Sequence, residues 1–161
     1  IGKSIKEDNC KSIIDDIFKI AKTNSCSVIY PEDVVVGKNM DDQAKIKELN
    51  EVTNDDLILD IGPKTIDKIK NIIESSETIL WNGPAGYFEN KHFAKGSYEI
   101  AKKIIEKNKK NLIYSIAGGG DTIAVLNKIK AVDSFDFVST AGGAFLEYLE
   151  GKQLPGIKAL N

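Results

Sequence analysis

The feature that most constrains the fold is a recurring order of segments. Four short apolar runs are each followed by a glycine-bearing loop and then by a stretch with helical spacing of apolar residues. The runs are Leu57–Asp60, Thr78–Trp81, Asn111–Ile116 and Phe137–Ser139. Repeated strand-then-helix order is typical of an α/β fold with a parallel sheet. We therefore predict a Rossmann-like parallel sheet with helices on both faces.

The first part of the chain carries weaker patterns. Helical spacing predicts a helix near Glu7–Lys22, followed by a short strand at Ser27–Tyr30. The β-branched run Val34–Val36 and the alternating segment Ala44–Val52 make an appended β-hairpin plausible. Gly62-Pro63 marks a helix start, and we expect Ile66, Ile69, Ile72 and Ile73 to form the buried face of that helix.

Composition limits the partners. The chain has 161 residues, which suits one domain spanning residues 1–161. A net charge of -2 argues against nucleic acid or an anionic membrane surface as the main partner. No apolar run is long enough to cross a membrane, so we expect a cytoplasmic enzyme. All 22 basic residues are lysines. No arginine of this sequence can therefore bind a phosphoryl group through the bidentate hydrogen bonds of a guanidinium.

A glycine turn between a strand and a helix is the strongest candidate site. Gly118, Gly119 and Gly120 follow the third apolar run, and Asp121 and Thr122 open the next helical stretch. Such a turn lets backbone N–H groups approach an anion at a helix N-terminus. Asp121 would repel a bare phosphate but suits one carried with Mg²⁺. The alternative is tight packing of strand and helix with no ligand.

The loops that follow the apolar runs form an ordered set. This set resembles the nucleotide-binding C-terminal domain of phosphoglycerate kinase. The matching segments are Leu59–Thr65, Trp81–Glu89, Gly118–Thr122 and Ser139–Gly156. The resemblance implies reversible phosphoryl transfer between 1,3-bisphosphoglycerate and Mg-ADP, with 3-phosphoglycerate and ATP as products.

The resemblance also implies roles for the phosphate side of the site. Asp121 matches the family position that helps to hold Mg²⁺, although a simple helix cap is compatible with it. Thr122 would offer its hydroxyl and N–H to the outer phosphates, and the glycine turn would cradle them. Gly142 and Gly143 open a second helix, whose N-terminus the family uses near the transferred group.

The resemblance implies roles for four further residues, two of them on the nucleoside side. Glu89 matches the acidic residue that binds the ribose hydroxyls of ATP or ADP. A single glutamate in a polar loop is, however, commonly a solvent-exposed residue without a ligand. Asn82 matches a position close to the phosphates, and Pro84 shapes its loop. Leu59 resembles part of the adenine slot, as any buried strand leucine would. Ile58 stands where relatives commonly have glycine.

The resemblance covers only part of the family's length. Family members carry further βα units with nucleotide-binding lysines before this segment, and an N-terminal domain that binds phosphoglycerate and brings an arginine. We therefore expect an incomplete sheet and a fragment truncated on its N-terminal side that does not catalyse the transfer alone. It would pair with the missing N-terminal domain of the same enzyme, or self-associate through an exposed sheet edge.

Two other functions stay open at this point. A dinucleotide-dependent oxidoreductase shares the fold class, but the G-x-G-x-x-G pattern after the first strand is absent. The chain could also be a non-catalytic nucleotide-binding or structural fragment. Binding of ADP separates this fragment from an inert one, and turnover separates it from an active kinase.

Overall fold

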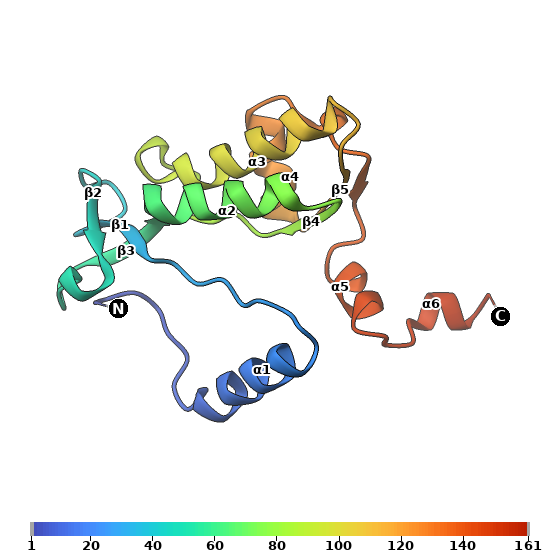
Figure 1. Cartoon of the computed structure of the whole chain (residues 1–161), viewed down its shortest axis with the longest axis horizontal. Helices are drawn as coiled ribbons and strands as arrows, with labels where there is room; N and C mark the ends of the chain where they lie inside the picture. The colour runs from blue at the N-terminus through green and yellow to red at the C-terminus, as the bar shows by residue number, and fades with distance from the viewer. Residues whose placement is uncertain (1, 161) are drawn as a thin grey trace.

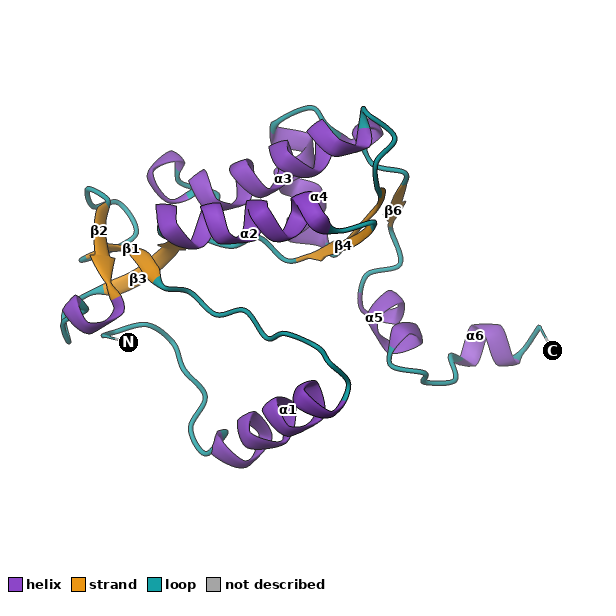
Figure 2. Ribbon diagram, viewed as in Figure 1, coloured by secondary structure: helices purple, strands orange, loops and turns teal. Residues whose placement is uncertain are grey.

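The chain folds as an α/β protein with two small sheets and a layer of helices. The computed structural model describes residues 2–160 (Figures 1 and 2). The strands are β1 (Asp33–Gly37), β2 (Lys45–Glu48), β3 (Leu57–Ile61), β4 (Thr78–Asn82), β5 (Tyr114–Gly118) and β6 (Phe137–Ser139). The helices are α1 (Lys11–Thr23), α2 (Pro63–Ser75), α3 (Lys95–Asn108), α4 (Gly120–Lys128), α5 (Gly143–Leu149) and α6 (Pro155–Lys158). Short 3₁₀ turns lie at Leu49–Glu51, Lys91–Phe93 and Val132–Ser134.

The parallel sheet has the order β4-β5-β6. β5 lies in the middle, and its residues Ser115 and Ala117 are fully buried. Because β4 and β6 both run parallel to β5, each connection between them must pass over the sheet through a helix. This confirms the predicted parallel α/β architecture for the second half of the chain.

Helices α2, α3 and α4 form one layer over this sheet (Figures 1 and 2). The main core lies beneath that layer and joins Trp81 of β4 to Ile104 of α3 and Leu126 of α4. The rings of Trp81 and Phe135 stack at a centroid distance of 6.2 Å. Burial of these side chains is what holds the helices on the sheet, since each large apolar side chain contributes roughly 1.5–3 kcal/mol.

The second sheet is antiparallel and has the order β2-β1-β3. β1 and β2 pair in register from Asp33 opposite Glu48 to Val36 opposite Lys45, which confirms the appended hairpin. Every residue of β1 is buried, as expected for the central strand of a sheet. A bulge between Val35 and Val36 shifts the register where β1 meets β3.

β3 is the main difference from the predicted topology. It begins a βα unit, because α2 follows it directly, but it pairs antiparallel with β1 instead of joining the parallel sheet. The apolar pattern of Leu57–Asp60 indicates a buried strand but does not name its neighbour. The neighbour of β3 is the buried run Val34–Val36 of β1. The apolar pattern of β3 alone could not predict this pairing.

Helix α2 begins where Gly62-Pro63 predicts, with Pro63 in its first turn. Its N-terminal N–H groups are capped from another element, because the Asp33 carboxylate of β1 accepts hydrogen bonds from Lys64 N (3.0 Å) and Thr65 N (2.9 Å). Ile66 and Ile73 are buried as expected. The expectation for Ile72 is wrong: this side chain is 39% exposed, because it lies at the edge of the helix's buried face.

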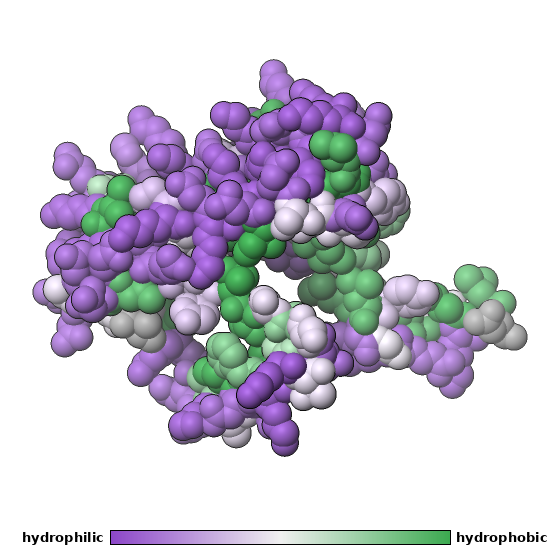
Figure 3. All heavy atoms as spheres, in the orientation of Figure 1, coloured by the Kyte–Doolittle hydropathy of each residue, from purple (hydrophilic) through white to green (hydrophobic). Residues whose placement is uncertain are grey.

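The N-terminal segment differs from prediction in one element. The expected strand at Ser27–Tyr30 does not form, because no partner strand lies beside it within residues 2–160, and Tyr30 is 60% exposed. Helix α1 does form, but only Ala21 in it is buried. Its apolar residues, including Ile13, Ile17 and Phe18, face solvent, and Figure 3 shows this hydrophobic surface.

Helix α1 lies apart from the α2–α4 layer, on the other side of the sheets (Figures 1 and 2). Residues of the parallel sheet such as Leu80 and Phe137 are also exposed, at 41% and 49%. Among the described residues, no helix is both long and apolar enough to span a bilayer.

A buried lysine joins α3 to the end of α2. Lys107 is 5% exposed, and its Nζ donates to the carbonyl oxygens of Ile73 (3.2 Å), Glu74 (2.5 Å) and Ser76 (3.0 Å). The last carbonyls of a helix have no partner within the helix and carry partial negative charge. Lys107 therefore supplies a C-terminal cap to α2 from a neighbouring helix.

Replacing Lys107 by Met should keep the side-chain volume and remove the lysine donor from all three carbonyls, of which only the Ile73 carbonyl keeps another hydrogen bond within residues 2–160, from Ser76 N at 3.2 Å. We expect the free energy of unfolding to fall by about 1–3 kcal/mol, the cost of leaving buried polar groups unpaired. Urea unfolding followed by circular dichroism measures it. Lys109→Met, at an exposed position at the end of the same helix, is the control, and equal effects of the two substitutions would contradict the capping role.

Candidate functional site

The carboxyl ends of the three parallel strands lie in a row. Asn82 of β4 pairs with Gly118 of β5, and Gly118 pairs with Ser139 of β6. In open α/β sheets, ligands bind in the crevice outside this edge. The row therefore brings together three of the loops that sequence analysis singled out, those after Asn82, Gly118 and Ser139.

The glycine turn after β5 has the geometry of an anion cradle. Gly119 is the N-terminal cap of α4 and has φ of +89°, a conformation that side chains rarely adopt. A Cβ at Gly118 would lie 2.9 Å from the ring of Phe145, whereas the space around Gly120 is open within 4 Å. The first N–H groups of α4 lack partners inside the helix. The turn thus presents donors that have no partner within α4 to a space that is open among the described residues.

Asp121 lies in the first turn of α4 and is exposed. Within residues 2–160, no group of three His, Cys, Asp or Glu side chains is placed to bind a metal. Mg²⁺ does not require such a cage, because it keeps several waters and binds through one or two carboxylates together with substrate phosphates. A single carboxylate beside the cradle therefore fits Mg²⁺ carried by a nucleotide.

Asn82 and Thr122 flank the glycine turn. The Asn82 amide lies against it, since a Cβ at Gly119 would be 3.2 Å from Asn82 Nδ2. Thr122 is fully buried, and its Oγ1 accepts a hydrogen bond from Gly83 N at 2.7 Å. Its hydroxyl oxygen is thus engaged with the loop after β4, and contact with a phosphate stays a prediction.

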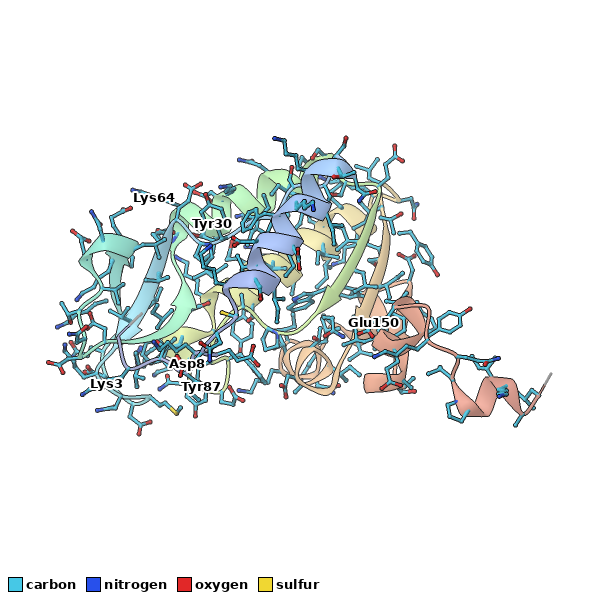
Figure 4. All side chains as sticks on the ribbon, turned by 90° about the horizontal axis from the view of Figure 1, so that it is seen from below. Lys3, Asp8, Tyr30, Lys64, Tyr87 and Glu150 are labelled. Carbon is cyan, nitrogen blue, oxygen red and sulfur yellow. The ribbon has the colours of Figure 1, made fainter. Side chains whose placement is uncertain are left out.

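Leu59 and Pro84 line one pocket of about 360 Å³ with Ile58, Gly86 and Tyr87. The pocket lies where the loop after β4 crosses β3, and the Tyr87 N–H donates to the Leu59 carbonyl at 2.7 Å. In Figure 4, Lys64 lies above the antiparallel strands and Tyr87 lies below them. The structure thus brings Leu59 and Pro84 together, and Ile58 occupies part of the same wall.

Glu89 lies further along the same loop and is exposed. It is not part of the wall of the Leu59 pocket. Its backbone carbonyl accepts a hydrogen bond from Lys128 Nζ at 3.3 Å. The carboxylate therefore faces solvent, while the backbone that carries it is held by α4.

Gly142 and Gly143 open α5, and Gly142 has φ of +55°. The space around both residues is open within 4 Å. Phe145 of α5 lies against Gly118, so the start of α5 is next to the cradle of α4. The two predicted helix N-termini are therefore neighbours at one edge of the sheet.

Asp60 is a residue to which sequence analysis assigned no role. Its side chain is buried and accepts hydrogen bonds from Ile61 N and Gly96 N, both at 2.8 Å. An added Cβ at Gly86 or at Gly96 would clash with its Oδ1. Asp60 therefore joins β3 to the start of α3 and to the loop after β4. Only the fold brings these glycines to it, so no local pattern could have indicated the contact.

Burial raises the pKa of the Asp60 carboxyl from 3.8 to about 6, although the hydrogen bonds from Gly96 and Ile61 oppose this rise. The folded protein thus holds a proton on Asp60 at pH values where the unfolded chain has lost it. The site contains a carboxyl group that titrates near neutral pH.

The comparisons with known proteins agree with this geometry. Residues 1–152 match the family model described as Phosphoglycerate kinase. The chain belongs to the phosphoglycerate kinase family. It is 43% identical to the phosphoglycerate kinase of Zymomonas mobilis and 44% identical to that of Orientia tsutsugamushi, in each case over 99% of this chain.

Solved phosphoglycerate kinase structures show the same fold. The structure from Coxiella burnetii superposes with a TM-score of 0.90 at 40% identity over 100% of this chain. The structure from Pyrococcus horikoshii superposes with a TM-score of 0.73 at 29% identity over 93% of it. The chain spans about two fifths of these relatives, 41% of the Zymomonas protein and 41% of the Coxiella chain. The family match does not support the oxidoreductase alternative.

The raised pKa of Asp60 predicts a pH-dependent contribution to stability. Because the folded-state pKa is higher than the unfolded one, this contribution is greatest below about pH 3.8 and is lost as pH rises through about 6. The difference in free energy of unfolding between the wild type and Asp60→Asn should therefore shrink over that range and then level off. Urea unfolding at several pH values tests this.

Asp133→Asn, at an exposed position in the turn Val132–Ser134, is the matched control. Its difference from the wild type should not follow the Asp60 profile. A wild-type minus Asp60→Asn difference that is constant from pH 4 to pH 7 would contradict the raised pKa.

Proposed function

We propose that this chain is the nucleotide-binding part of a phosphoglycerate kinase. The parent enzyme transfers a phosphoryl group between 1,3-bisphosphoglycerate and Mg-ADP to give 3-phosphoglycerate and ATP. The observation that carries the proposal is the open glycine turn Gly118–Gly120 at the N-terminus of α4, in register with the end of β4. Family membership directs that turn to a nucleotide.

The phosphates of ADP or ATP would lie at the cradle. The N–H groups at the start of α4 would donate to phosphate oxygens, and the partial positive charge of the helix end would favour them. Asp121 would hold the Mg²⁺, which neutralises charge on the phosphate oxygens when bound. Gly142 and Gly143 would let a second helix end approach the transferred group, where preorganised N–H donors act on developing charge.

The nucleoside would extend from the cradle along the loop after β4. The Glu89 carboxylate would accept hydrogen bonds from the ribose hydroxyls, a pairing that suits two neighbouring donors. Leu59 and Pro84 would form the apolar wall for adenine. Asn82, beside the glycine turn, would lie between the phosphates and the nucleoside of the bound nucleotide.

Transfer requires groups that these residues do not supply. Phosphoryl transfer depends on positioning and on cationic groups around the phosphoryl, and no arginine occurs in this sequence. We therefore propose that residues 1–161 form part of a C-terminal domain that binds nucleotide without completing the reaction. The phosphoglycerate site would belong to the N-terminal domain of the longer protein.

The exposed apolar surfaces of α1 and of the parallel sheet favour a partner. In the longer protein, further residues of the same enzyme would cover them. For the chain alone, self-association is the alternative, since large exposed apolar patches and unpaired strand edges promote it. A concentration-independent monomer in size-exclusion chromatography would argue against self-association.

A second candidate is a fragment that folds but binds no nucleotide. The observation that favours it is the exposure of α1, in which only Ala21 is buried and the larger apolar side chains are largely exposed. If the apolar face of α1 stabilises the site only when covered, the cradle alone will not hold ADP. Nucleotide binding separates the two candidates.

Calorimetric titration with Mg-ADP tests the proposal. We expect saturable binding that Asp121→Ala weakens on the order of 10-fold or more, since loss of even an outer-shell partner typically weakens metal affinity by that amount. Asp133→Ala, at an exposed position outside the cradle, is the control and should bind as the wild type does.

No heat of binding from the wild type would contradict the proposal and support the inert fragment. A coupled assay with 1,3-bisphosphoglycerate and Mg-ADP separates binding from catalysis. We expect no turnover by this chain alone.

A further inference from the structure

Helix α4 holds both ends of the loop Gly83–Asn90. At its first turn, Thr122 Oγ1 accepts from Gly83 N at 2.7 Å. At its last turn, Lys128 Nζ donates to the Phe88 carbonyl at 3.1 Å and to the Glu89 carbonyl at 3.3 Å. The ammonium also lies 5.1 Å from the centre of the Phe88 ring. Helix α4 therefore carries the cradle at its N-terminus and is hydrogen-bonded to the loop that contains Glu89.

The middle of this loop has other anchors. Ala85 N donates to Ser97 Oγ at 3.0 Å, and Tyr87 N donates to the Leu59 carbonyl at 2.7 Å. After Glu89, the Asn90 side chain donates to the Met40 carbonyl at 2.8 Å. Among the described residues, the backbone of Glu89 itself receives only the hydrogen bond from Lys128.

The contact of Lys128 combines three favourable terms. A charged donor makes stronger hydrogen bonds to carbonyls than a neutral one. The face of the buried Phe88 ring attracts the cation. A lysine at a helix C-terminus is also favoured by the helix dipole. Here the ammonium reaches beyond its own helix to the loop, so it does more than complete the end of α4.

The length of α4 sets the distance between the loop contact of Thr122 and the loop contact of Lys128. Lys128 is six positions after Thr122, which is about 9 Å along a helix axis. A helix of this length does not stretch, so the separation between the cradle at one end and the Glu89 backbone at the other is kept. The phosphates and the ribose of a nucleotide are joined by a short covalent link, so their separation also lies within a narrow range.

We propose that Lys128 is a positioning residue that sets the Glu89 carboxylate at the distance from the cradle that a ribonucleotide requires. The inference rests on the proposed function and deepens it. Lys128 does not touch the ligand. Its removal should reduce recognition of the ribose hydroxyls and leave recognition of the phosphates largely unchanged.

Three variants separate the possibilities. Lys128→Met removes the donors and keeps most of the stem, whereas Lys128→Arg keeps a cation that can donate to both carbonyls. Lys102→Met, at an exposed lysine of α3, controls for the loss of one positive charge.

The first measurement needs no ligand. Hydrogen exchange should become on the order of 10-fold faster at the Asn90 and His92 amides in Lys128→Met, because these amides are bonded within the turn after Glu89. Lys128→Arg and Lys102→Met should exchange as the wild type does. Unchanged exchange in Lys128→Met would overturn the proposal whatever the nucleotide results are.

The second measurement compares binding of Mg-ADP with binding of its 2′-deoxy and 3′-deoxy analogues. Lys128→Met should lower the preference for ADP to the level of Glu89→Gln, with little further loss in the double variant. Equal weakening for ADP and both deoxy analogues would indicate a merely structural role and overturn the proposal.

The wild type distinguishes this proposal from the proposed function. If it binds no nucleotide, the proposed function fails, and the ribose role of Lys128 fails with it. If it binds ADP and both deoxy analogues equally, the cradle stands, but the roles given to Glu89 and Lys128 are wrong.

Discussion

The rest of the structure depends on the pairing of β5 with both of its neighbours in parallel. β5 is short, its residues Ser115, Ala117 and Gly118 are buried, and its register places Gly118 between Asn82 and Ser139. A carboxylate reinforces the pairing of β5 with β6. Asp136, just before β6, accepts hydrogen bonds from Ser115 N (2.7 Å) and Ser115 Oγ (2.9 Å). These hydrogen bonds lower the pKa of the Asp136 carboxyl. A shift of β6 would break them and move α5 away from the cradle.

Buried carboxylates connect the two sheets to the helical layer. Asp33 of β1 caps α2, and Asp60 of β3 holds the start of α3. Burial opposes ionisation of both, but at Asp33 the hydrogen bonds from Thr65 and Lys64 outweigh it and lower the pKa. At Asp60 burial prevails and the pKa rises. The antiparallel sheet is thus more than an appendage, because its strands supply the carboxylates that hold the starts of α2 and α3.

Much of the architecture was predictable because it follows local patterns. The order of strands and helices, the hairpin, the start of α2 at Pro63 and the glycine turn before α4 all depend on residues close in sequence. The expected strand at Ser27–Tyr30 was wrong, since a strand requires a partner that no local pattern supplies. The placement of β3 failed for a similar reason: its residues specify a buried strand, and only the buried β1 decided which sheet it joined.

For the site, the sequence by itself determined the residue types and their order: the glycine turn, the acidic residue at the helix start and the glutamate in the loop after β4. Only the tertiary structure decided how they are supported. Lys128 reaches Glu89 across 39 residues, Thr122 reaches Gly83 across 39, and Asp60 reaches Gly96 across 36. The periodicity of the sequence does not predict such contacts. A lysine at a helix end or an aspartate at a strand end gives the same sequence pattern whether its side chain contacts water or a distant backbone. Their partners exist only once the sheets and helices have packed.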